Sequence, residues 1–167
     1  VLDIVRLKLF GLSSSPIEDS EITIIWNLRM PRAILAIFIG GGLALSGVVM
    51  QSITQNILAE PYMVGVSSGA LAFVTFGYFI GISIVNTWFG RAIMAFTGSI
   101  LALIAVYKLS NAGHRIANSK LILTGMAVST ILTALSNFFI IATPNTNVIK
   151  GILSWTMGSV ASARWDN

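Results

Sequence analysis

The chain has 167 residues, of which 55% are hydrophobic and only 10% are charged. A soluble domain carries roughly 25% charged residues, so this composition argues against a soluble protein and predicts a membrane protein. The formal net charge of +4 reflects few acidic residues rather than a basic patch, so nucleic acid binding is not expected. The chain has no cysteine, which leaves neither a disulfide framework nor a thiolate metal site. The single histidine, His114, cannot form a metal cluster alone.

The first 28 residues are the least hydrophobic part of the chain. Charges at residues 3, 6 and 8 predict a short amphipathic helix at the membrane interface, and Gly11 to Pro16 end it. Residues 17–28 predict a second short helix, with Trp26 near the lipid headgroups. Pro31 then suits the first position of a spanning helix, where a missing N–H donor costs nothing.

Four long uncharged runs follow, over residues 33–59, 61–90, 92–107 and 121–149. About 20 apolar residues cross a bilayer core, and unpaired backbone in lipid is tolerated only in helices or closed barrels. Strict apolar and polar alternation is missing, which disfavours a barrel. We therefore predict an all-α polytopic membrane helix bundle with about four spanning helices and short interfacial helices. The predicted spans cover residues 31–51, 64–82, 92–107 and 121–142, and a short helix is predicted over 148–157.

Small residues recur every four positions along the first predicted span, as at Gly40 and Ala44. This spacing allows another helix to approach closely, so Gly40, Ala44 and Gly47 are candidate packing residues inside a bundle. Gln51, at the end of this span, is expected to hydrogen-bond a neighbouring helix. The alternative for all four residues is ordinary packing without a functional role.

No catalytic motif is visible in the sequence: a Walker A pattern, a zinc-binding histidine pair and a nucleophile elbow are all missing. Apart from Arg32 at the start of the first one, no predicted span contains an acidic or basic residue, so no proton relay is evident. These observations disfavour an enzyme and a proton-coupled carrier.

Several motifs in this order resemble one known family. They are Arg29-Met-Pro-Arg32, the glycines 40–42, Ser46-Gly47, Gln51, Asn56-Ile-Leu-Ala-Glu-Pro61, Gly65-Val-Ser-Ser-Gly69-Ala70, Leu121–Ser129 and Trp155-Thr-Met-Gly158-Ser159 with Trp165. This set resembles the FecCD-type permeases, the membrane subunits of ABC importers for iron–siderophore complexes, haem and cobalamin. Ile57 departs from the proline that the family carries in its N-P-L-A motif, and Val64 departs from its usual leucine.

The resemblance implies a permease of about ten helices, of which this chain would be roughly the first half, a fragment lacking the first helix. It implies an extracytoplasmic segment over residues 1–30, four transmembrane helices within 31–142, and an extracytoplasmic turn and short helix over 143–167. It further implies a multi-pass protein of the bacterial cytoplasmic membrane. The expected partners are a second permease subunit in a homo- or heterodimer, cytoplasmic ATPase subunits, an extracytoplasmic binding protein and the lipid bilayer. No cofactor is expected in this chain itself, since ATP and Mg would bind the ATPase subunits.

The resemblance also assigns roles to particular residues. Arg29 and Arg32 would pair with glutamates of the binding protein, because opposite charges steer docking and fix its register. The alternative is that both arginines snorkel to headgroups. The cytoplasmic gate would include four residues: Asn56, Leu58, Asn118 and Ser119. Here the alternatives are that Asn56 caps backbone groups in its turn, and that Asn118 and Ser119 cap the fourth predicted span.

The expected function is therefore that of a non-catalytic permease subunit importing an iron–siderophore or related metal chelate such as haem or cobalamin. Two alternatives remain open from the residues: a secondary carrier or channel subunit, and a membrane assembly subunit that does not transport. A carrier would need ionisable groups or broken helices near the bilayer midplane. The sequence does not specify which chelate is moved.

Overall fold

The computed structural model describes residues 2–11, 18–111 and 118–165, and the regular elements among them are all helical. These residues form two compact units. One contains residues 1–45 and 158–167, and the other contains residues 46–157. Because the regular elements of the described residues are all helical, the predicted all-α class is confirmed.

The first unit contains α1 (Leu2–Phe10) and, as far as Leu45, one long continuous helix. The long helix runs through α2 (Asp19–Ile22), the π-helix η1 (Thr23–Arg29) and α3 (Met30–Thr54), for 36 residues in all. The prediction that Pro31 begins a helix is therefore wrong, as is the separation of residues 17–28 from the first span. A proline inside a helix lacks an N–H donor and its ring collides with the carbonyl four residues earlier. The wider π-helix just before Pro31 relieves this conflict, since the Met30 N–H bonds to the carbonyl of Ile25, five residues back.

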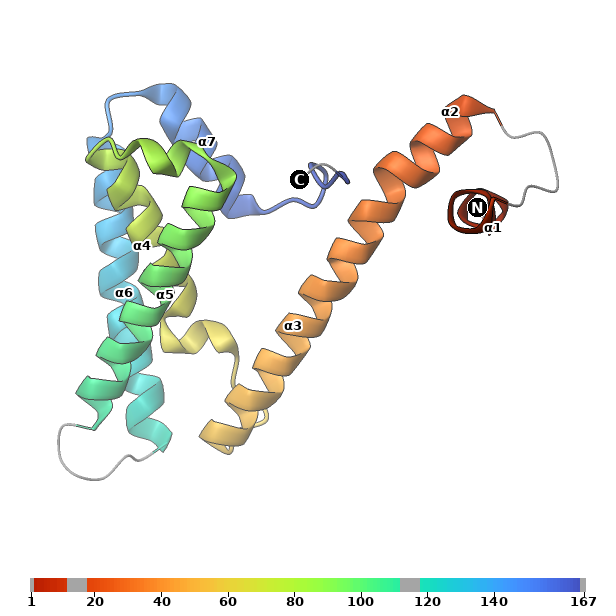
Figure 1. The fold of residues 1–167 in the computed structure, drawn as a ribbon. Coiled ribbons are helices and arrows are strands. Elements are labelled where there is room, and N and C mark those ends of the chain that lie inside the picture. The colour runs from red at the N-terminus through yellow and green to blue at the C-terminus, as the bar shows by residue number, and fades with distance from the viewer. Residues whose placement is uncertain (1, 12–17, 112–117, 166–167) are drawn as a thin grey trace. The chain divides into compact units, whose positions relative to one another are not determined.

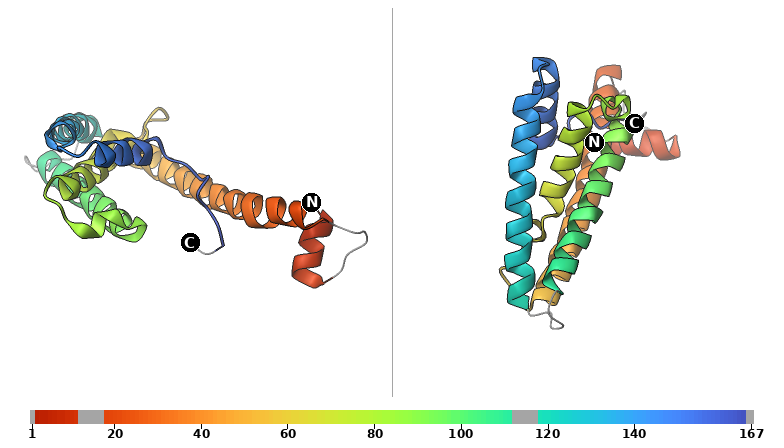
Figure 2. Two further views of the ribbon diagram at one scale, coloured as in Figure 1. Left: turned by 90° about the horizontal axis from the view of Figure 1, so that it is seen from above. Right: turned by 90° about the vertical axis from the view of Figure 1, so that its left-hand side faces the viewer.

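The second unit is built around α4 (Val66–Phe79), which packs against both α5 (Trp88–Ser110) and α6 (Asn118–Ala142) (Figure 1; Figure 2). The buried residues of α4 are small or β-branched: Gly69, Ala72, Val74, Thr75 and Gly77. In lipid the hydrophobic effect does not drive helices together, so they associate through close van der Waals packing. Small side chains at the contact allow the helix backbones to approach closely enough for this. Ser99 of α5 adds a hydrogen bond across this packing, because its Oγ donates to the Val66 carbonyl over 3.0 Å.

Short elements close the second unit at its ends. The 3-10 helix η2 (Pro61–Val64) leads into α4 through Gly65, which adopts a left-handed conformation with φ of 81°. The 3-10 helix η3 (Ser83–Asn86) joins α4 to α5, and α7 (Thr146–Met157) follows α6. The short helix predicted over 148–157 is therefore present and begins two residues earlier.

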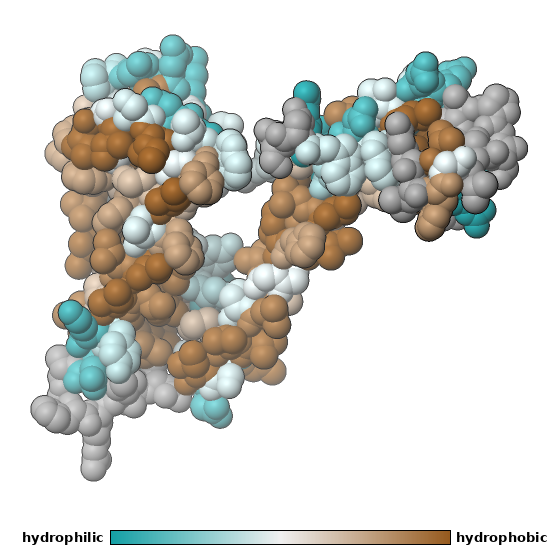
Figure 3. All heavy atoms as spheres, in the orientation of Figure 1, coloured by the Kyte–Doolittle hydropathy of each residue, from teal (hydrophilic) through white to brown (hydrophobic). Residues whose placement is uncertain are grey.

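Three of these helices are long and apolar enough to cross a membrane: Asp19–Thr54, Trp88–Ser110 and Ser119–Ala142. The helix predicted over residues 64–82 is shorter than expected, because η2 and Gly65 replace its first turn and α4 ends at Phe79. Apolar residues cover much of the surface of the second unit between more polar ends (Figure 3). The exposed side chains of α5 and α6 include large apolar ones such as Phe96, Leu103 and Ile131, which suits contact with lipid. The structure thus confirms a polytopic membrane helix bundle, with three full-length spans where the sequence predicted four.

Candidate functional site

The two predicted docking arginines lie at the junction of η1 and α3, in different environments. Arg29 is exposed, and its side chain makes no hydrogen bond or ion pair with any residue that the structure describes. Arg32 is half-buried, and its Nη2 donates to the carbonyl of Ala161 over 2.6 Å. Its Nε is buried and has no hydrogen-bond partner within the described residues. Arg32 therefore holds the chain after α7, whereas Arg29 is available to a partner.

The segment from Gly158 to Trp165 folds against the start of α3 through a succession of turns. Gly158 adopts a φ of 68°, which glycine tolerates without strain. The Ser159 hydroxyl then accepts from the Ala161 N–H over 3.0 Å, and the Ala163 N–H donates to the Val160 carbonyl. These turns orient Arg164 and Trp165 toward the long helix.

Trp165 anchors this segment. Its Nε1 donates to the carbonyl of Trp26 over 2.7 Å, and the two indole rings contact each other with centroids 5.4 Å apart. Aromatic pairs at this separation stabilise a contact by about 0.5–1.5 kcal/mol beyond their buried area. The sequence predicted Trp26 near the lipid headgroups, and the structure shows that it contacts Trp165.

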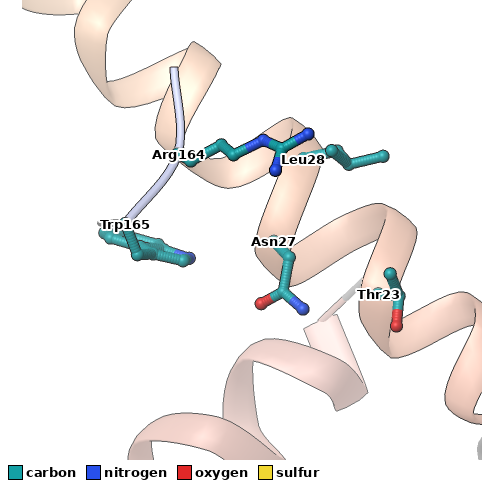
Figure 4. Close-up of a pocket in the computed structure, with 5 residues that line it drawn as sticks. All are labelled: Thr23, Asn27, Leu28, Arg164 and Trp165. Carbon is teal, nitrogen blue, oxygen red and sulfur yellow. The ribbon is translucent and has the colours of Figure 1, made fainter. Parts of the chain in front are cut away.

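A hollow of about 470 Å³ lies between this segment and η1, lined by Thr23, Asn27, Leu28, Arg164 and Trp165. Figure 4 shows the Arg164 side chain extending toward Leu28 across the π-helix, with Asn27 between Trp165 and Thr23. Arg164 is exposed, and no described residue makes an ion pair or a hydrogen bond with its guanidinium. Arg164 was not predicted as a site residue, because 132 positions separate it from Arg32 in the sequence.

The turn after α3 contains the first pair of predicted gate residues. The Asn56 Oδ1 accepts from the Leu58 N–H over 2.9 Å, and the Gln51 Nε2 donates to the Ile57 carbonyl over 3.0 Å. Gln51 thus bonds to the turn rather than to a second helix. The side chains of Ile57 and Leu58 remain 82% and 76% exposed. The turn therefore has a backbone fixed by two side-chain amides and presents two apolar side chains.

The second pair of predicted gate residues lies at the start of α6. The helix begins at Asn118, and Ser119 is exposed in its first turn. The Asn118 side chain and His114 lie outside what the structure describes. A role for this pair in a gate stays a prediction.

The described residues offer no candidate metal centre, since no three His, Asp or Glu side chains among them come together. An open groove of about 600 Å³ does occur in the second unit, between α4, α6 and α7. Hydroxyl groups and aromatic rings line it, including those of Tyr62, Ser68, Ser129 and Trp155. None of the residues that line this groove is charged.

The profile of the FecCD transport family matches residues 3–167. The chain belongs to the FecCD transport family. It is 35% identical over 158 residues to the achromobactin transport system permease protein CbrC of Dickeya dadantii, which covers 94% of this chain and 44% of that protein. It is 30% identical over 159 residues to the molybdate import system permease protein MolB of Haemophilus influenzae, covering 95% of this chain and 45% of MolB. This member of the FecCD transport family thus spans less than half the length of these relatives.

A solved structure also resembles this FecCD chain. It is described as an inward-facing conformation of a metal-chelate type ABC transporter, and the two chains superpose with a TM-score of 0.75 at 30% identity. The superposition covers 98% of this chain and 51% of the other. The resemblance inferred from the motifs is therefore confirmed, and the chain is a membrane protein.

The small-residue stretch of α3 has an open environment. A Cβ atom added at Gly40 or Gly47 would meet no described atom within 4 Å, and Ala44 is exposed. Their role in packing stays a prediction. Close packing instead occurs between Gly69 of α4 and Gly98 of α5, where a Cβ atom added at Gly69 would lie 2.5 Å from the Gly98 carbonyl oxygen.

Proposed function

We propose that this chain is part of the permease subunit of a binding-protein-dependent ABC importer that moves an iron–siderophore or related metal chelate across a bacterial cytoplasmic membrane. The match to the FecCD transport family over residues 3–167 carries this proposal. The relatives' names refer to achromobactin, an iron chelatin, cobalamin and Fe(3+)-citrate. One relative's name refers instead to molybdate.

The geometry of α3 supports this function. From Arg32 to Thr54 the helix rises about 33 Å, which exceeds the roughly 30 Å of bilayer hydrocarbon. The basic residues and the Asn56 turn would therefore lie at opposite membrane surfaces. Arg29 would face the extracytoplasmic binding protein, and Leu58 would contribute to the cytoplasmic gate with Asn56, Asn118 and Ser119.

The permease performs no catalysis in this proposal. Separate cytoplasmic ATPase subunits would bind ATP and Mg, and a second permease subunit would complete the pathway. Substrate would pass between the two permease subunits as the helices tilt. An apolar side chain such as Leu58 can close such a pathway by narrowing it and excluding water.

The test is uptake by the full-length protein, reconstituted in proteoliposomes with its ATPase and binding protein. Ferric citrate, a ferric hydroxycarboxylate siderophore, cobalamin and molybdate are offered as separate labelled substrates. We expect uptake of one chelate that needs both ATP and the binding protein. Uptake without ATP would favour the secondary carrier or channel, no uptake would favour the assembly subunit, and molybdate uptake alone would contradict the chelate assignment.

Orientation is tested separately with single cysteines at positions 29 and 57 of the full-length protein. A maleimide that cannot cross membranes should label position 29 from outside intact cells and position 57 only after the membrane is opened. The reverse pattern would overturn the proposed topology.

A further inference from the structure

We propose that Arg164 forms a second carboxylate-binding contact for the extracytoplasmic binding protein, beside Arg29, and that the hollow beneath it receives an acidic side chain of that partner. This inference rests on the proposed importer function. In this proposal Arg164 takes the docking role that the family resemblance gives to Arg32.

The first argument is availability. Arg32 is half-buried and already bonded to the Ala161 carbonyl. Arg29 and Arg164 are exposed, and within the described residues neither side chain has a hydrogen bond or an ion pair. A guanidinium can bind a carboxylate bidentately through two parallel N–H donors, and Arg164 retains both.

The second argument is preorganisation. Trp165, the neighbour of Arg164, is held by its hydrogen bond to Trp26 and by the ring contact between them. Directly before Arg164, the turn from Val160 to Ala163 fixes the backbone. A side chain presented from a fixed backbone loses less conformational entropy on binding.

The third argument is the composition of the hollow. Leu28 and the Trp165 ring offer apolar surface for the methylene groups of a glutamate or aspartate, and Asn27 adds a polar amide to the lining (Figure 4). The volume of about 470 Å³ is ample for one such side chain together with water. The cavity thus provides positive charge at its rim and apolar surface within.

The carboxylate is expected to come from another molecule. Three acidic residues of the same unit, Glu18, Asp19 and Glu21, lie within two helical turns of Thr23. None of them is ion-paired to Arg164 among the described residues, and Glu18 instead accepts from the Ser20 hydroxyl over 3.1 Å. A charged partner that approaches from outside can therefore engage Arg164 directly.

The test measures the affinity of the purified binding protein of this transporter for the full-length permease–ATPase complex in phosphatidylcholine nanodiscs. Arg164→Glu should weaken binding by about tenfold or more at 50 mM salt, and by less than about threefold at 500 mM, because salt screens exposed charge pairs. Arg164→Gln should weaken it by about threefold to fivefold at 50 mM. Arg6→Glu, an exposed arginine of α1, controls for net charge and should change binding less than about twofold.

A compensating change identifies the contact. A glutamate of the binding protein changed to arginine should restore the affinity of the Arg164→Glu variant and weaken that of the unchanged permease. The unfolding temperature of each variant reports whether it is correctly folded, so a loss of affinity at an unchanged unfolding temperature is attributable to charge.

The outcomes distinguish a failure of this inference from a failure of the proposed importer function. If Arg29→Glu weakens docking and Arg164→Glu does not, the inference fails and the importer function stands. If the binding protein does not bind the unchanged complex at all, the proposed function fails. If the Arg164 effect occurs only in nanodiscs of anionic phosphatidylglycerol, the residue contacts lipid headgroups and the inference is overturned.

Discussion

Gly69 and Gly98 face each other across α4 and α5 so closely that neither position has room for a methyl group. A Cβ atom on Gly69 would lie 2.5 Å from the Gly98 carbonyl oxygen and 2.6 Å from the Ala102 Cβ atom. The Gly98 atom that a Cβ on Gly69 would meet is a backbone oxygen, which cannot rotate away as a flexible side chain would. This contact therefore fixes the distance between the two helices.

Replacing Gly98 by alanine should destabilise the protein by about 1–3 kcal/mol, as overpacking does in tightly packed cores. Thermal unfolding of the detergent-solubilised full-length protein measures the effect. Gly151→Ala is the matched control, since its added Cβ would meet nothing within 4 Å in the described structure. Its alanine should be neutral or stabilising by up to about 1 kcal/mol, because glycine disfavours helix interiors. Equal effects at both positions would contradict the close approach.

Removing the hydroxyl of Ser99 should destabilise the same helix pair by about 0.6–1.5 kcal/mol, since its hydrogen bond to the Val66 carbonyl connects two helices. Ser129→Ala is the comparison, because the Ser129 Oγ is buried without a hydrogen-bond partner among the described residues. Its removal should cost less than Ser99→Ala or raise the unfolding temperature. A larger loss at Ser129 would show that its hydroxyl has a partner outside these residues.

Arg32→Ala should release the chain after α7 while Arg29→Ala should not. Arg32 donates a charge-assisted hydrogen bond to Ala161, of a type that contributes about 1.5–3 kcal/mol. Its loss should raise local opening by about tenfold to a hundredfold, so trypsin should cleave after Arg164 correspondingly faster. Mass spectrometry of the cleavage products measures the rate at this bond. If Arg29→Ala accelerates cleavage as much as Arg32→Ala does, the difference in roles is refuted.

Leu58→Ala should leave the fold intact and impair the proposed gate. The side chain is 76% exposed, and exposed substitutions usually change stability by less than about 0.5 kcal/mol. Proteoliposomes containing the full-length variant should leak preloaded chelate faster in the absence of ATP. Asn56→Ala provides the contrast, since it removes the acceptor of the Leu58 N–H and should disorder the turn. An unchanged leak in Leu58→Ala would exclude this leucine from the gate.

Much of the fold could be predicted because membrane helices follow from hydrophobic length. The spans predicted over 92–107 and 121–142 occur as Trp88–Ser110 and Asn118–Ala142, extended at their polar ends where hydropathy gives no boundary. Glu60 is extended, with φ of −114° and ψ of 148°, as expected before Pro61. The break before α4 was thus predictable, whereas the 3-10 turn and the left-handed Gly65 were not.

Other features depended on contacts that the sequence does not reveal. The same four-residue spacing of small side chains occurs in α3 at Gly40 and Ala44 and in α5 at Gly98 and Ala102. Only in α5 does the described structure place a helix against it. The pairing of Trp26 with Trp165 joins positions 139 residues apart, and no local pattern predicts such a contact. The contact of Arg32 with Ala161 likewise joins distant positions, so the different environments of Arg29 and Arg32 were not predictable, and their docking role stays a prediction.

The shortness of α4 has a consequence for how the protein meets lipids of different chain length. Its 14 residues rise about 21 Å, roughly 9 Å less than a typical hydrocarbon layer. The carbonyl of Met63 lies against Gly125 of α6, so protein rather than acyl chains shields the backbone that precedes α4. Thicker or thinner bilayers should therefore change the tilt of α5 and α6 through hydrophobic mismatch, while α4 keeps a position set by its neighbours.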